Sequence, residues 1–405
     1  MTRSMRIRPE SFYFTLFLAA LGAIVPLSID LGLPAIPTIS RSLGSSSATA
    51  ALTLSVFMAG YALAPIVLGP LSDRYGRRPV LLSSLALFTV AGVTCAAAPS
   101  MSILLASRVI QGAGAGAGAV LVLAIVRDSF EGRLARSRLA YVRVIQTVAP
   151  MIAPTLGAWV LAAGGWRAIY GTLAGAGLVL FALVAFGFTE SARLRGGPSL
   201  APRVLWSNYR QVLGNKVSLG YILINAFTFG ALFAYVSGSP LVMLELLHVS
   251  PRVYGLLFAT TASGITAGAF LSGRLNARGV APSRLLTGGL VLAATASVLL
   301  LVIAASGMAR VSTLLPPLVL CTFSAGLIGP NAAHGAMDPL PEIAGAAAAV
   351  LSFLQMVCGS VSGMLVASLY DGRTALSMTG MMLVFSLAAL SVYAGILRRL
   401  PPTAA

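Results

Sequence analysis

The chain has 405 residues and a net charge of +17; 58% of its residues are hydrophobic and 9% are charged. Because a soluble domain carries about 25% charged residues, this composition excludes a soluble globular protein and indicates a protein embedded in a membrane. The apolar residues form unbroken runs of about 20, the length of a membrane-spanning helix, rather than the alternating segments of about ten residues that β-barrel strands show.

Twelve membrane spans are expected along the chain. The first six are at 12–37, 48–70, 79–98, 101–126, 139–163 and 167–188, and the second six are at 217–241, 252–275, 283–305, 311–332, 343–368 and 375–397. Arginine is frequent at both termini and in the even-numbered gaps, and it is rare in the odd-numbered gaps. The positive-inside rule then places both termini in the cytoplasm of a multispan protein in the cell membrane. The basic residues are explained as topology signals, so we expect no nucleic-acid partner.

Asp30, in the first span, is the one acidic residue that this assignment places well inside the membrane, out of ten acidic residues. A carboxylate at membrane depth costs about 2.5–3.5 kcal/mol on insertion scales, so a functional role is expected. A proton can neutralise it, and a cationic substrate can pair with it. Arg108 in the fourth span is expected at the same depth, about 10 Å below the outer surface. An ion pair between them is possible; the alternative to a proton-coupling pair is a static salt bridge between two helices.

The gap after the second span, residues 69–78, reads GPLSDRYGRR. Asp73 can pair with a basic residue or meet the N-terminal end of a neighbouring helix, while Gly69 allows close helix approach and Gly76 permits a tight turn. Such a pair would be a conformational latch that opens when the protein changes state. A simple topology anchor is the alternative, and it explains the arginines but not Asp73 or the glycines. The expected latch residues are Gly69, Asp73, Arg74, Gly76, Arg77 and Arg78.

The fourth and fifth spans contain helix-packing and helix-bending residues. Residues 112–118 read GAGAGAG, and their small-xxx-small spacing predicts close packing on two faces of the fourth span. In the fifth span, Pro150 and Pro154 lie on one face with Gly157 near it, which softens or kinks the helix. We interpret these three residues as a hinge or seal against leak; ordinary irregularity of a membrane helix is the alternative.

Residues 190–216 divide the chain into two halves. This segment carries five basic residues and the turn-forming run GGP at 196–198, and we interpret it as a cytoplasmic linker between six-helix bundles at 1–189 and 217–405. A long loop within one domain fits the same residues. Residues 273–279, GRLNARG, repeat the pattern Gly-x-Leu-polar-x-Arg followed by Gly that is found at 69–76. Repeated halves with the substrate site between them are a known transporter design.

Aromatic and polar side chains near the middle of the second, seventh and eleventh spans are candidates for a substrate pocket. Packing is the alternative role, because aromatic residues in spans mostly serve it. With Asp30, the candidates are Phe57, Tyr61, Asn225, Phe229, Phe233, Tyr235, Phe353 and Gln355. The cysteines at 95, 321 and 358 lie inside spans without a CxxC or Cys/His cluster, so we expect neither a disulfide nor a metal site.

Four segments together resemble the major facilitator superfamily. Residues 69–78 resemble its cytoplasmic signature G-x-L-x-D-R-x-G-R-R, and residues 108–112, RVIQG, resemble its R-x-x-Q-G signature. Residues 149–157, APMIAPTLG, are similar to the proline–glycine signature of its antiporter branch, with Ala153 in place of the usual leading glycine. Residues 30–37, DLGLPAIP, resemble the end of the first span in twelve-span drug–proton antiporters, particularly the bicyclomycin/chloramphenicol-resistance exporters.

This resemblance implies an all-α membrane protein with the major facilitator fold, twelve transmembrane helices in two pseudo-symmetric six-helix bundles. It implies a monomeric antiporter of the inner membrane that exports drugs by alternating access, driven by the proton gradient and without a cofactor. Asp30 and Arg108 would then couple protons to a small-molecule substrate. An exporter or symporter of an endogenous metabolite on the same fold is the alternative. A membrane-embedded enzyme or a channel is disfavoured because the sequence has no HExxH or GxSxG motif and no selectivity-filter sequence.

Overall fold

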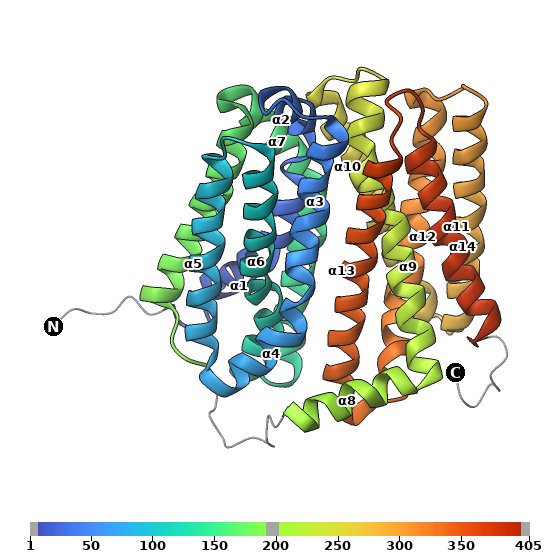
Figure 1. Cartoon of the computed structure of the whole chain (residues 1–405). Coiled ribbons are helices and arrows are strands. Elements are labelled where there is room, and N and C mark those ends of the chain that lie inside the picture. Colours follow the sequence, from blue (N-terminus) through green and yellow to red (C-terminus); the bar gives the residue numbers. More distant parts are fainter. Residues whose placement is uncertain (1–6, 192–201, 398–405) are drawn as a thin grey trace. The chain divides into compact units, whose positions relative to one another are not determined.

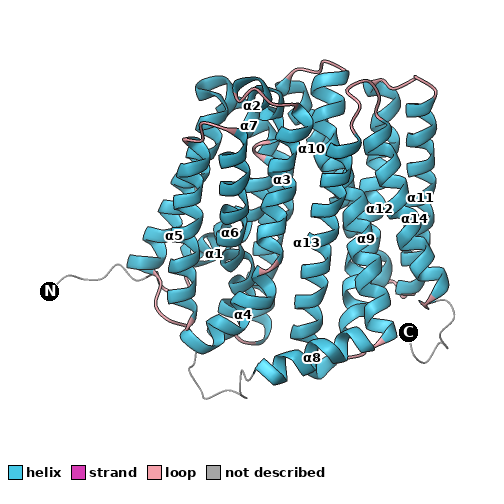
Figure 2. Ribbon diagram, in the orientation of Figure 1, coloured by secondary structure: helices cyan, strands magenta, loops and turns pink. Residues whose placement is uncertain are grey.

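A computed structural model describes residues 7–191 and 202–397. All regular secondary structure in this described part is helical, as Figure 2 shows. The turn expected at 196–198 lies outside the described residues. In chain order the elements (Figure 1) are α1 (Phe12–Asp30), η1 (Leu33–Ala35), α2 (Ile36–Ser42), α3 (Ser47–Ala62), α4 (Ala64–Tyr75), α5 (Arg77–Ala96), α6 (Met101–Ser129), α7 (Gly132–Ala182), η2 (Leu183–Gly187), α8 (Pro202–Gly214), α9 (Lys216–Pro240), η3 (Leu241–Leu246), α10 (Pro251–Ala277), α11 (Pro282–Ala305), α12 (Val311–Met337), η4 (Pro341–Ile343), α13 (Ala344–Leu369) and α14 (Leu376–Gly395).

Eleven stretches of the described chain are long and apolar enough to cross a membrane, against the twelve expected. The difference arises because α7 and the π-helix η2 form one stretch of 56 residues, Gly132–Gly187. A straight helix of that length would measure about 84 Å, more than twice the hydrocarbon core of a bilayer. Gly165 interrupts the stretch with a φ of 72° and a ψ of −175°. The part before Gly165 packs on α1 and the part after it packs on α5. Gly165 therefore separates the predicted fifth and sixth spans.

The described residues fold as two compact units. Unit 1 comprises residues 7–43 and 56–191, and unit 2 comprises Gly44–Ser55 together with residues 202–397. Helix α8 packs in unit 2 against α9 and α13. The segment at 190–216, which was predicted to be a linker, therefore contains a helix that is part of unit 2.

Close helix packing in both units depends on glycine. In unit 1, Gly60 of α3 and Gly112 of α6 each lie where an added Cβ atom would collide with the backbone of the other helix. In unit 2, Gly268 of α10 and Gly326 of α12 make the same reciprocal contact. The other three glycines at 112–118 contact α1, α4 and α5, so close packing on two faces of the fourth span is confirmed. The same pair of spans in each half, the second and fourth, is thus joined in the same way.

Candidate coupling site

Asp30 is the last residue of α1, at the point where the first span stops being regular α-helix. The chain continues through Leu31 and Gly32 into the short 3₁₀ turn η1 and then into α2, where Pro34 and Pro37 prevent a continuous hydrogen-bond ladder. Only 5% of the Asp30 surface is exposed. Its carboxylate makes no hydrogen bond or ion pair with any residue that the structure describes. A buried charge without a partner is costly, so a proton or a cation at this carboxylate would be stabilised.

Arg108 is buried beside α1, and its guanidinium group joins four helices of unit 1. Its Nη1 donates to Gln111 Oε1 at 2.7 Å on α6, and its Nη2 donates to the backbone carbonyl of Ser28 at 2.9 Å on α1. The guanidinium carbon lies 4.2 Å from the ring centre of Phe57 on α3 and 5.5 Å from that of Tyr170 on α7. Cation–π contacts of this kind are strengthened when the cation is desolvated.

The ion pair between Asp30 and Arg108 that their equal depth made possible does not form in this structure. Arg108 instead directs its donors to Gln111 and to the carbonyl of Ser28, two residues before Asp30. Residues two apart on a helix do not face the same direction, so a shared depth does not bring their side chains together. The role of both residues in proton coupling remains a prediction.

The antiporter-like segment of α7 lies directly against the end of α1. A Cβ atom on Gly157 would collide with the backbone carbonyl of Leu31 and would meet the ring of Pro34 at 3.2 Å. The helix remains continuous through Pro150 and Pro154. Gly157 therefore allows α7 to touch the backbone immediately after Asp30, and the hinge or seal role of the segment remains a prediction.

The latch segment forms an ion-pair network centred on Arg77, at the start of α5. Its Nη1 pairs with Asp73 and donates to Ser72 Oγ at 2.6 Å, while its Nε donates to Asp128 Oδ2 at 2.9 Å. The Arg77 side chain is 10% exposed, whereas that of Asp73 is 54% exposed. Asp73 thus has the basic partner that the sequence suggested. Because Asp128 lies at the end of α6, the network joins α4, α5 and α6.

Glu190 caps the N-terminus of α5, a role that was not predicted from the sequence. Its Oε1 accepts from the backbone N–H of Arg77 at 2.8 Å, and its Oε2 accepts from that of Arg78 at 3.0 Å. Gly76 adopts a φ of 97°, and an added Cβ atom would lie 2.5 Å from Glu190 Oε2. Gly76 therefore supplies both the turn that was predicted and the space for the carboxylate. The available signal was the position of Glu190, directly after the sixth span on the same side as residues 69–78.

The remaining latch candidates have different environments. Arg78 donates to the backbone carbonyls of Val184, at 3.4 Å, and Ala185, at 2.7 Å, in the π-helix η2. The Arg74 guanidinium lies 5.3 Å from the ring centre of Tyr75. Gly69 does not support the close helix approach expected of it, because an added Cβ atom would meet only Val120 Cγ1, at an ordinary 3.9 Å.

The substrate-pocket candidates are found in mixed environments. In unit 1, Phe57 is fully buried against Arg108, and Tyr61 is 8% exposed. In unit 2, Tyr235 is buried and its hydroxyl lies 2.6 Å from Thr261 Oγ1. Phe229 stacks on buried Phe233, while Asn225, Phe353 and Gln355 are half-buried. Their roles in substrate binding remain predictions.

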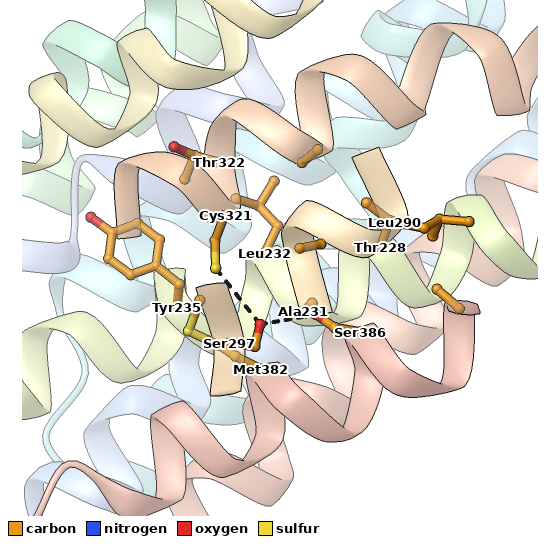
Figure 3. A pocket seen from close by; sticks show the side chains of 13 residues that line it. Thr228, Ala231, Leu232, Tyr235, Leu290, Ser297, Cys321, Thr322, Met382 and Ser386 are labelled. Carbon is orange, nitrogen blue, oxygen red and sulfur yellow. Dashed lines mark hydrogen bonds between the residues drawn. The ribbon is translucent and has the colours of Figure 1, made fainter. Parts of the chain in front are cut away.

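Unit 2 contains a small internal cavity between α9, α11, α12 and α14 (Figure 3). It offers about 20 Å³ to the centre of a water molecule, which is room for one or very few waters. Tyr235 lines it, and Ser297 lies 3.1 Å from Ser386 Oγ and 3.6 Å from Cys321 Sγ at its wall. A drug-sized ligand requires several hundred Å³, so this cavity is not a drug site.

The helical architecture and the signature segments agree with a known family, because the family model described as Major Facilitator Superfamily matches residues 16–366. The chain belongs to the major facilitator superfamily. It is 30% identical over 377 residues, 93% of both chains, to the uncharacterized MFS-type transporter YdgK of Bacillus subtilis (strain 168). It is 30% identical over 363 residues to multidrug resistance protein D of Escherichia coli (strain K12), covering 89% of this chain and 90% of the relative. A bacterial homolog of the human lysosomal transporter Spinster, in an inward-facing and unoccupied conformation, superposes with a TM-score of 0.75 at 15% identity, covering 97% of this chain and 100% of that chain.

Membership of this superfamily confirms three expectations. The fold is the all-α major facilitator fold, the protein is a multispan membrane transporter, and it is not an enzyme. A small-molecule substrate follows from the transporter family.

Proposed function

We propose that this protein is a proton-coupled antiporter that exports lipophilic drugs across the bacterial inner membrane, as a monomer with both termini in the cytoplasm. The relatives named as multidrug resistance proteins support the substrate class. The observation that carries the proposal is Asp30, a buried carboxylate at the end of α1 that has no partner among the described residues and lies beside a glycine contact with α7. A proton and a cationic or polar substrate group are both suitable partners for it.

In the proposed cycle, a proton from outside neutralises Asp30 and favours release of the substrate outward. Loss of that proton toward the cytoplasm restores the charged carboxylate and the substrate-binding form. Each proton contributes about 2.3 kcal/mol per 100 mV of membrane potential, in addition to any pH gradient. Arg108, held by Gln111 and the Ser28 carbonyl, would provide a fixed positive charge near the end of α1 throughout the cycle.

The test is substrate-triggered proton movement in proteoliposomes with an imposed pH gradient, using amphenicols, lipophilic cations and small metabolites. We expect an amphenicol or a lipophilic cation to drive proton movement in the antiport direction, and Asp30→Asn to abolish it without loss of folded protein. Asp371→Asn, which removes an exposed carboxylate from the loop before α14, is the matched control and should transport normally. Preserved pH-dependent efflux in Asp30→Asn would contradict the coupling role. A response to metabolites alone would replace drug export with metabolite transport.

A further inference from the structure

Helix α8 lies across the ends of α9 and α13 in unit 2 (Figure 1) and packs against both. Val212 is fully buried in a cluster with Ile222 of α9, Ala336 of α12 and Ala347 of α13. Tyr209, nearly one turn earlier, packs partly against the same cluster. Helix α8 therefore crosses the ends of these three helices in a defined orientation.

The exposed side of α8 carries an apolar stripe beside a basic stripe. Trp206 is 71% exposed and Leu213 is 48% exposed. They are seven residues apart and thus nearly in line along the helix. Arg203 and Arg210 are also exposed and seven residues apart. Because Arg210 follows Trp206 by four residues and precedes Leu213 by three, the two stripes are adjacent.

The charged residues of α8 and of the first turn of α9 are all basic. Residues 202–216 contain Arg203, Arg210 and Lys216 and no acidic residue. Helix α8 lies at the end of unit 2 where α9 begins and α12 ends, the end that the arginine distribution assigns to the cytoplasm. The cytoplasmic leaflet has a negative surface potential, which attracts basic segments next to a membrane span.

We propose that the exposed side of α8 binds anionic phospholipid headgroups of the cytoplasmic leaflet. Trp206 and Leu213 enter the boundary between headgroups and acyl chains, and Arg203 and Arg210 pair with the lipid phosphates. Interfacial helices combine these features: an apolar face with Trp or Leu bordered by Arg. The docked face at Val212 holds the stripe in place, so a lipid does not have to order the helix in order to bind.

A second copy of the chain is a poor occupant for this stripe. Stable protein interfaces bury about 800 Å² per partner. The exposed apolar side chains of α8 are those of Trp206, Leu213 and Val204. An aromatic side chain buries about 150–250 Å², so these three fall well short of that area. The unbroken positive charge of residues 202–216 also opposes pairing of two identical helices.

The test compares the full-length wild type with Arg203→Gln/Arg210→Gln in two measurements. The first is binding of phosphatidylglycerol and of phosphatidylcholine to the purified proteins by native mass spectrometry. One arginine near an anionic surface corresponds to about a fivefold change in binding, so the double variant should bind phosphatidylglycerol about 25-fold more weakly at this site and phosphatidylcholine unchanged. The matched control is Arg252→Gln/Arg373→Gln, which removes the same charge from exposed residues at the other end of unit 2 and should bind like the wild type.

The second measurement is quenching of tryptophan fluorescence in nanodiscs by lipids brominated near the headgroup. The wild type should show a quenched component that is absent in Trp206→Phe, which keeps the other two tryptophans as background. Equal phosphatidylglycerol binding by the wild type and Arg203→Gln/Arg210→Gln would overturn the proposal. So would a Trp206 component that bromolipids do not quench, or a dimer in the mass spectrum that is lost in Trp206→Phe.

Discussion

Replacing Gly157 by alanine tests the contact between α7 and the end of α1. The added methyl group would collide with the Leu31 carbonyl and approach the Pro34 ring at 3.2 Å. Overpacking against backbone costs about 1–3 kcal/mol, while alanine gains about 1 kcal/mol of helix propensity over glycine. A net loss of stability of up to about 2 kcal/mol is expected. The chain after Asp30 should also be displaced, which should weaken the proposed proton-driven efflux.

Gly175→Ala is the matched control for this prediction. Gly175 lies in the part of α7 after Gly165, and an added Cβ atom there has nothing within 4 Å. Its substitution should leave stability unchanged or raise it by about 1 kcal/mol. The measurement is the midpoint of SDS-induced unfolding in mixed micelles, followed by efflux in proteoliposomes. If Gly157→Ala and Gly175→Ala unfold at the same midpoint, the close contact with Leu31 does not contribute to stability and this prediction is wrong.

Two further predictions concern charged residues outside the spans. Glu190→Gln removes the negative charge that faces the first backbone N–H groups of α5, and should lower stability by about 1 kcal/mol in the same titration. Glu131→Gln, a helix N-cap whose side chain makes no capping bond, should have little effect, and equal losses would contradict the capping role. The pKa of Asp371 is lowered by hydrogen bonds from the Arg373 backbone and from the Thr374 hydroxyl and backbone. The ionised Asp371 therefore stabilises the folded protein, and this contribution is complete above the pKa of the unfolded state, about 3.9. The contribution is lost as the pH falls through the lower pKa of the folded state. The melting-temperature difference between the wild type and Asp371→Asn should therefore be constant from pH 8 to pH 5 and shrink below about pH 4; a change between pH 8 and pH 5 would contradict this assignment.

The spans and the short motifs could be predicted because they depend on local composition. An apolar run long enough to cross a bilayer has few other folded forms, so the membrane helices follow from hydropathy. The boundary between the fifth and sixth spans was also predicted correctly, because the gap at 164–166 contains Gly165, where the backbone is not helical. Gly76 was identified because a tight turn between two spans requires a residue that tolerates positive φ.

Contacts between distant residues could not be obtained in the same way. Depth along a helix places Asp30 and Arg108 at one level but does not give the rotation of either helix, and Arg108 bonds to Gln111 and Ser28 instead. Glu190 was missed because the bond it makes is to backbone N–H groups more than 100 positions earlier. Helix α8 was not predicted because the face that packs on unit 2 has only a few apolar residues, such as Val212, and these are interspersed with charged and polar residues.

The interruption of α7 at Gly165 divides this helix into the two arms of a hairpin. One arm of this hairpin touches the chain after Asp30 through Gly157, and the other arm leads through η2, whose carbonyls bind Arg78, to Glu190 at the start of α5. The two arms are joined by a connection with a single non-helical residue, which leaves little slack between them. A tilt of both arms together would therefore displace the C-terminal end of α1 and the ion-pair network centred on Arg77 in one movement. Lengthening the connection at Gly165 would uncouple the two movements while leaving each contact chemically intact.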